Sequence, residues 1–82
     1  MSDHIRETLH SILAEDLDLP TAEITPAALL IEDLGLDSVA FAIGVVAIEE
    51  RLGVQLTDRE MAETASVGEL EELVRSKAGV AP

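Results

Sequence analysis

The residue with the clearest chemical potential is Ser38, which follows Asp37 and precedes an uncharged apolar run over residues 39–48. Asp37 can cap a helix that begins at Ser38, and Gly53 can end this helix. The free N–H groups and the dipole at a helix start favour an anionic group, so a hydroxyl at this place is well positioned to carry a phospho group. The alternative is that the Asp-Ser pair only caps the helix.

The other candidates for catalysis are weak. The chain has no cysteine, which excludes disulfides, thiolate metal sites and a thiol nucleophile of its own. His4 and His10 lie six residues apart, a poor spacing for one helix face, and neither is near Ser38 in the sequence.

A metal site is also disfavoured. Asp33 and Asp37 could suggest a calcium-binding loop, but Gly35 and Gly44 fall where an EF-hand needs ligands. We expect no bound metal ion.

Composition limits the class of protein. The 82 residues allow one domain, over residues 1–82, and 48% hydrophobic residues are enough for a core. A net charge of −12 with one Phe and no Trp or Tyr argues against nucleic-acid binding. The longest apolar run is about half a membrane span, and because Asp3, His4, Arg6 and Glu7 interrupt the first ten residues, we expect no signal peptide. A cytoplasmic monomer is expected.

The elements that must position Ser38 are helices. Periodicity and capping signals predict helices over residues 5–16, 38 to about 52, roughly 58–63, and from Ser66 to about 77. Ser2 or Asp3 could cap the first helix, Thr57 with Glu60 matches a capping box, and Ser66 with Glu69 matches another. No strand is predicted, so the fold class is a small all-α bundle of three longer helices and one short one.

Residues 17–37 form a different kind of segment. Pro20, Pro26 and Gly35 interrupt it, and its apolar residues follow no single period. We predict a long loop between the first and second helices that packs down on the core, with one helical turn near residues 26–30.

The second helix carries apolar residues on two sides. Its core face would consist of Phe41, Val45, Ile48 and Leu52, and its opposite face of Val39, Ala42 or Ile43, and Val46. A bundle this small can hardly enclose both faces, which predicts an exposed recognition surface. The alternative is that the long loop covers the second face. Gly44, in the middle of this helix, indicates either the close approach of a neighbouring backbone or room beside the core.

The segment from Glu32 to Val39, with Leu34-Gly35-Leu36-Asp37-Ser38 at its centre, resembles the phosphopantetheine attachment motif of acyl carrier proteins. The order of the expected helices and the connectors at residues 54–58 and 64–67 are also similar to that family. The resemblance implies that a phosphopantetheinyl transferase attaches a 4′-phosphopantetheine arm to Ser38. It further implies partners that load and process acyl groups on the terminal thiol, and a carrier that catalyses nothing itself.

The chain departs from the family pattern in two respects, and the first concerns its partners. Typical members place acidic residues two and five positions after the serine, where this chain has Ala40 and Ile43. We therefore expect partners to meet an apolar face with an acidic rim, and we assign this interface to Asp37, Val39, Ile43, Val46, Glu49 and Glu50.

The second departure is Gly44, where the family commonly has a bulky apolar residue. In many carriers the acyl chain enters a cavity beside this helix. Gly44 could enlarge such a cavity, and the residues expected to line it are Phe41, Gly44, Val45 and Ile48.

Several uses of a carrier remain open. The missing acidic residues favour a dedicated pathway (polyketide, lipopeptide, siderophore or specialised lipid) over general fatty acid synthesis. The Leu-Gly-Leu-Asp-Ser form looks more like acyl carriers than peptidyl or aminoacyl carriers. The alternative of another class is a helical interaction module that is never modified.

Overall fold

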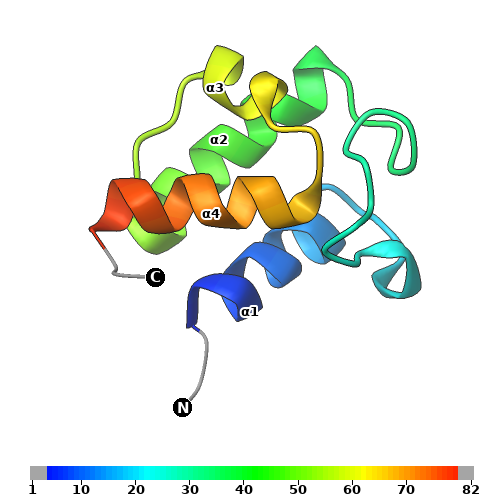
Figure 1. Ribbon diagram of the computed structural model, residues 1–82, viewed down its shortest axis with the longest axis horizontal. Coiled ribbons are helices and arrows are strands. Elements are labelled where there is room, and N and C mark those ends of the chain that lie inside the picture. Colours follow the sequence, from blue (N-terminus) through cyan, green and yellow to red (C-terminus); the bar gives the residue numbers. More distant parts are fainter. Residues whose placement is uncertain (1–3, 80–82) are drawn as a thin grey trace.

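The helices begin and end close to the residues that the capping signals indicate. The structure is a computed structural model that describes residues 4–79 (Figure 1). Its helices are α1 (His4–Ser11), a π-helix η1 (Ile12–Asp16), a 3-10 helix η2 (Thr21–Glu23), α2 (Ser38–Leu52), α3 (Asp58–Glu63) and α4 (Val67–Ala78). The all-helical prediction is confirmed, and the expected cap at Ser2 or Asp3 lies outside the described residues.

The first predicted helix is present but changes type along its length. The α-helical part ends at Ser11 and continues as the π-helix η1, in which the Leu17 N–H donates to the Ile12 carbonyl at 3.1 Å. Ile12 and Leu13, the first two residues of η1, are both fully buried.

Local side chains fix the starts of α3 and α4. The Thr57–Glu60 capping box is complete, with both hydrogen bonds at 3.0 Å. At α4, Ser66 Oγ accepts from the Glu69 N–H at 3.3 Å, as predicted. The Glu69 carboxylate, however, accepts from the Ala65 N–H, one residue earlier than a capping box requires. The second predicted box is therefore only half formed.

The long loop packs down as predicted, but its internal structure differs. Ile24, Ala28, Leu30, Leu34 and Leu36 are all buried in the core. The helix assigned within residues 17–37 is η2, directly after Pro20, and the prediction of a helical turn at residues 26–30 was wrong.

Residues 26–30 instead pair with the start of α4. Leu30 N–H donates to the Ala65 carbonyl at 2.9 Å, Val67 N–H to Ala28 at 3.0 Å, and Gly68 N–H to Pro26 at 2.9 Å. The loop carbonyls thus satisfy two of the backbone donors that a helix leaves free at its N-terminus. An isolated β-bridge between Leu29 and Ser66 results from this pairing.

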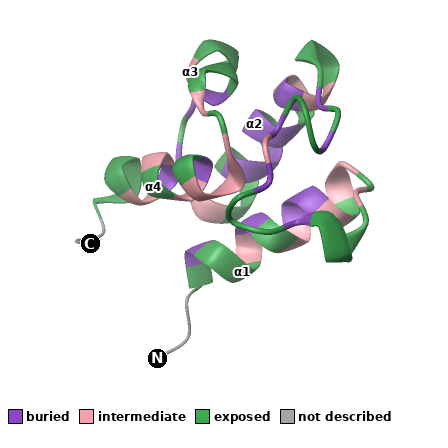
Figure 2. Cartoon of the chain, turned by 45° about the vertical axis from the view of Figure 1, so that its right-hand side comes forward, coloured by how far each residue is buried: buried purple, intermediate pink, exposed green. Residues whose placement is uncertain are grey.

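One core joins all of these elements. In Figure 1, α4 crosses the centre of the molecule, α1 lies below it, α3 lies at the top, and the loop lies at the right-hand side. α2 packs against α1, η1 and α3, and Figure 2 shows buried residues on the inward sides of the helices and the loop. The most buried large side chains are Leu9, Ile12, Leu13, Leu30, Ile48, Met61, Leu70 and Val74.

A polar contact also ties α3 to α4. Lys77 Nζ lies 2.6 Å from Glu60 Oε2, while the other Glu60 oxygen accepts the Thr57 N–H. The hydrogen bond from Lys77, followed by the backbone bond from Thr57, lowers the pKa of Glu60 below its ordinary value.

Candidate functional site

Ser38 occupies the first position of α2 and is exposed to solvent. Asp37 precedes it in extended conformation, and its Oδ1 accepts the Ala40 N–H at 2.9 Å. The first turn of α2 contains no acidic residue. The hydroxyl therefore lies at the positive end of a helix dipole, where a negatively charged substituent is stabilised.

The segment before Ser38 is held by its own hydrogen bonds. Asp33 Oδ2 accepts from the Leu29 N–H at 2.8 Å, and the Leu36 N–H donates to the Leu30 carbonyl at 3.0 Å. Gly35 has φ +68°, a left-handed conformation that a residue without Cβ adopts at little cost. The serine thus follows an ordered turn.

The second apolar face of α2 is open to solvent. Val39, Ile43 and Val46, which we call the α2 stripe, are 66%, 44% and 52% exposed. The core face is buried at Phe41, Val45 and Ile48, and the alternative that the loop covers the stripe is wrong. One turn of helix separates successive members of the stripe, so they lie in a row that starts beside Ser38.

Acidic residues flank the stripe without entering it. Glu49 and Glu50 are exposed at its far end, and Glu49 also accepts from Gln55 Nε2 at 3.2 Å. Asp37 is exposed at the end that carries Ser38. The structure therefore places all six predicted interface residues on the surface, with the charges at the two ends of the row.

Sequence reasoning missed a further exposed apolar residue, Ile31, in the loop before Ser38. Its side chain is 57% exposed, although the neighbouring Leu30 is fully buried. The adjacent acids Glu32 and Asp33 were the available signal, because a segment this polar turns toward solvent.

The four residues expected to line an acyl cavity are all buried, but a side chain fills the space beside Gly44. A Cβ placed on Gly44 would lie 2.8 Å from Met61 Cε and 3.2 Å from Met61 Sδ. Met61 itself is fully buried. The neighbour of Gly44 is therefore a flexible side chain from α3, not the backbone that one interpretation expected.

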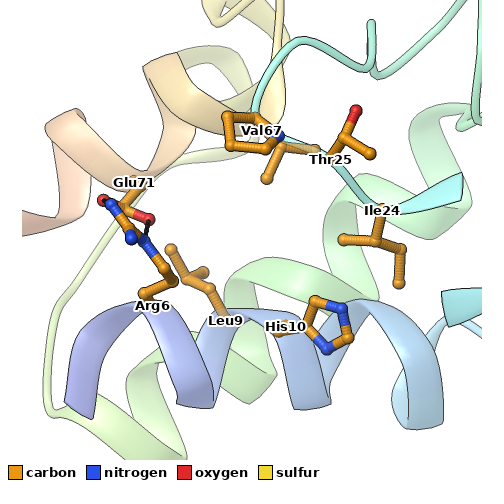
Figure 3. Close-up of a pocket in the computed structure, with 8 residues that line it drawn as sticks. Arg6, Leu9, His10, Ile24, Thr25, Val67 and Glu71 are labelled. Carbon is orange, nitrogen blue, oxygen red and sulfur yellow. Dashed lines mark hydrogen bonds and ion pairs between the residues drawn. The ribbon is translucent and has the colours of Figure 1, made fainter. Parts of the chain in front are cut away.

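A separate apolar crevice of about 80 Å³ lies between α1, the loop and α4 (Figure 3). Leu9, Ile24 and Val67 contribute to its walls, and the Arg6–Glu71 ion pair, with Nε and Oε1 3.0 Å apart, lies at its edge. None of the residues assigned from the sequence to the attachment site, the partner interface or the acyl cavity lines this crevice.

Residues 4–79 lack two further features, a metal-binding cluster and a membrane-spanning helix. That part of the chain contains no group of three or more His, Cys, Asp or Glu side chains placed to hold a metal ion. It also contains no helix that is long and apolar enough to span a membrane.

Comparison with known proteins agrees with the motif around Ser38. The sequence model of the family described as "Phosphopantetheine attachment site" matches residues 7–74. Acyl carrier protein MbtL of Mycobacterium tuberculosis (strain ATCC 25618 / H37Rv) is 52% identical over 73 residues, which cover 89% of this chain and 87% of the relative.

Two further relatives are less similar. Acyl carrier protein MbtL of Mycobacterium sp. (strain MCS) is 42% identical over 81 residues, or 99% of this chain and 91% of the relative. The acyl carrier protein of Helicobacter pylori (strain G27) is 33% identical over 64 residues, or 78% and 82% of the two chains.

Proposed function

This chain belongs to the acyl carrier proteins, and on that premise we propose that the Ser38 hydroxyl is the attachment point of its 4′-phosphopantetheine arm. The observation that carries the proposal is the exposed serine at the first position of α2, inside the matched region. When bound, the arm supplies a thiol that holds acyl groups as thioesters. The protein is a carrier and not an enzyme.

The surroundings of Ser38 suit a phosphodiester. The helix dipole and the acid-free first turn stabilise a negative charge there, and the Asp37 cap fixes the direction of the helix start. In the transfer, Ser38 Oγ forms a bond to the phosphorus of coenzyme A that carries the pantetheine. The pyrophosphate bond breaks, adenosine 3′,5′-bisphosphate leaves, and the transferase accepts the hydroxyl proton.

The α2 stripe is proposed as the centre of the surface that partner enzymes contact. Its exposed aliphatic side chains suit an apolar patch on the partner, and the exposed charges of Asp37, Glu49 and Glu50 suit basic residues around that patch. The partners are the phosphopantetheinyl transferase and the enzymes that load and process the acyl group.

We propose a dedicated pathway, of the secondary-metabolite or specialised lipid type, over general fatty acid synthesis. The identity to the MbtL carriers, 42% and 52%, exceeds the 33% to the Helicobacter pylori carrier. The absence of acidic residues from positions 38–48 also suits a carrier that serves few partners. We further propose that it acts as a monomer in the cytoplasm, where coenzyme A is available.

The test of the attachment site is intact-mass spectrometry. The protein is incubated with coenzyme A, Mg²⁺ and a broad-specificity phosphopantetheinyl transferase. We expect a gain of one phosphopantetheine in the wild type and in the control Ser66→Ala, and no gain in Ser38→Ala. Modification of Ser38→Ala, or none in the wild type, would contradict the proposal.

A further inference from the structure

We propose that Met61 is a movable plug whose side chain determines how much of an acyl chain this carrier can bury. The inference rests on the proposed attachment at Ser38 and adds a specificity-determining residue on α3. It is based on the packing of the flexible Met61 side chain against α2 at Gly44, where the helix has no side chain of its own.

The Met61 side chain fills the gap beside α2 that the missing side chain of Gly44 leaves. Its Cε and Sδ atoms lie within 3.2 Å of the position that a Cβ of residue 44 would take, and Leu17 Cδ1 follows at 3.8 Å. Gly44 is six residues after Ser38, which is about 9 Å along the helix. The gap is therefore within a short distance of the point where the arm begins.

Among the buried side chains around this gap, Met61 is the one best able to move. It is unbranched, with three side-chain torsions and a polarizable sulfur, so it can leave one packing arrangement and adopt another. Val45 and Ile48, by contrast, are branched at Cβ and restricted in χ1. Rotation of Met61 away from Gly44 would expose apolar side chains and helix backbone without unfolding either helix.

A thioester-bound acyl chain provides the driving force for that rotation. An alkyl chain in water gains about fourfold in its partition constant for each methylene that it buries. A short acyl group gains too little to displace Met61, while a chain of several carbons gains enough. The volume vacated by Met61, together with the absent side chain at Gly44, then limits the length that is protected.

The sequence offers a direct spectroscopic probe, because the chain contains two methionines, Met1 and Met61. Protein labelled with ¹³C at the methionine methyl group gives one signal from each, and Met61→Leu assigns them. The Met61 signal is compared in the unmodified, phosphopantetheinylated, acetyl-loaded and long-chain-loaded protein. We expect it to shift in the long-chain form and to stay in place in the other three.

A chemical readout uses the same series. The rate of thioester cleavage by hydroxylamine is measured for acyl chains of increasing length on the wild type, on Met61→Ala and on Gly44→Leu. We expect Met61→Ala to slow cleavage of the longest chains by about fourfold or more, and Gly44→Leu to remove the protection. Val74 is a fully buried residue of α4, and Val74→Ala is the control for general loosening of the core.

The outcomes separate this inference from the proposed function. If Ser38 takes up no arm, the attachment proposal itself is wrong. If the arm is attached but the Met61 signal is the same with acetyl and long-chain groups, the plug is wrong. Met61→Leu is the control for misfolding of Met61→Ala and Gly44→Leu, because leucine has a volume similar to that of methionine. In Met61→Leu we expect only a weaker dependence of thioester protection on acyl-chain length. Cleavage rates in Met61→Leu and Met61→Ala that equal those of the wild type would also overturn the inference.

Discussion

Asp37 stands beside the proposed attachment site, but its carboxylate is already engaged in the helix. Oδ1 accepts the Ala40 N–H at 2.9 Å, and the Asp37 carbonyl accepts the Phe41 N–H at 2.9 Å. The residue therefore has a structural role that does not depend on any partner. Its exposed negative charge is available to partners at the same time.

Loss of this cap should reduce stability measurably. We expect Asp37→Ala to lower the free energy of unfolding by about 1 kcal/mol, because the Ala40 N–H loses its acceptor. Asp37→Asn keeps a side-chain oxygen and should lose less. Urea unfolding followed by circular dichroism measures both. Equal losses in the two variants would show that the charge, and not the cap, is responsible.

Also at the scale of the residue, the contact of Gly44 with Met61 is a feature that could not be predicted from the sequence. The glycine signalled a close approach, but the approaching group comes from another helix 17 residues further along the chain. No local pattern records which side chain that is. Ser38 and Asp37, by contrast, could be placed correctly because a helix start is encoded by adjacent residues.

At the scale of the element, the α2 stripe is the feature with the most direct consequence for function. We expect Ile43→Glu to lower kcat/KM of the native acyl-loading enzyme by about tenfold or more, because a charge would enter the apolar centre of the contact. Ser76→Glu on α4 adds the same charge at another exposed position and should leave turnover unchanged. Unchanged turnover in Ile43→Glu would remove the stripe from the interface.

The link between α3 and α4 should depend on pH. Because Lys77 and Thr57 lower the pKa of Glu60 in the folded protein, its contribution to stability is present above its ordinary value of 4.5 and is lost as pH falls through the folded pKa. Thermal unfolding should show the wild type more stable than Glu60→Gln at neutral pH, with the gap closing in acid. Glu63→Gln, on the same helix, is the matched control. A gap that is constant into strong acid would contradict this role of Glu60.

The helices and the loop differ in how accurately they could be predicted from the sequence. α2 and α3 could be predicted to within a residue, because Asp37, Gly53 and Thr57 act on their own neighbours. The loop could not, since residues 26–30 pair with the start of α4, nearly 40 residues away. A helical turn near Pro26 is compatible with the local residues, but it would leave the Val67 and Gly68 donors without these acceptors.

At the scale of the whole molecule, the negative charge lies outside the surface that we propose to contact the partners. The net charge is −12, yet none of the 17 acidic residues lies between positions 38 and 48. The charge can therefore attract a basic partner from a distance, while apolar side chains make the contact. Association and dissociation should respond differently to salt.

We expect the association rate with the phosphopantetheinyl transferase to fall about tenfold between about 50 and about 500 mM NaCl. The dissociation rate should change little, because apolar contacts are not screened. Surface plasmon resonance gives both rates. If salt raises the dissociation rate as strongly as it lowers the association rate, ion pairs and not the α2 stripe dominate the contact.

The pairing of the loop with α4 has a consequence for how the arm moves. Amide protons of loops usually exchange with solvent quickly, but those of Leu30, Val67 and Gly68 are held in hydrogen bonds of 2.9–3.0 Å between segments distant in sequence. In deuterated water we expect them to exchange about as slowly as the amides within α2, and rapid exchange would contradict this. The turn that leads into α2 would then stay fixed while the arm moves, so that once the carrier has docked on an enzyme, the arm alone reaches for the active site.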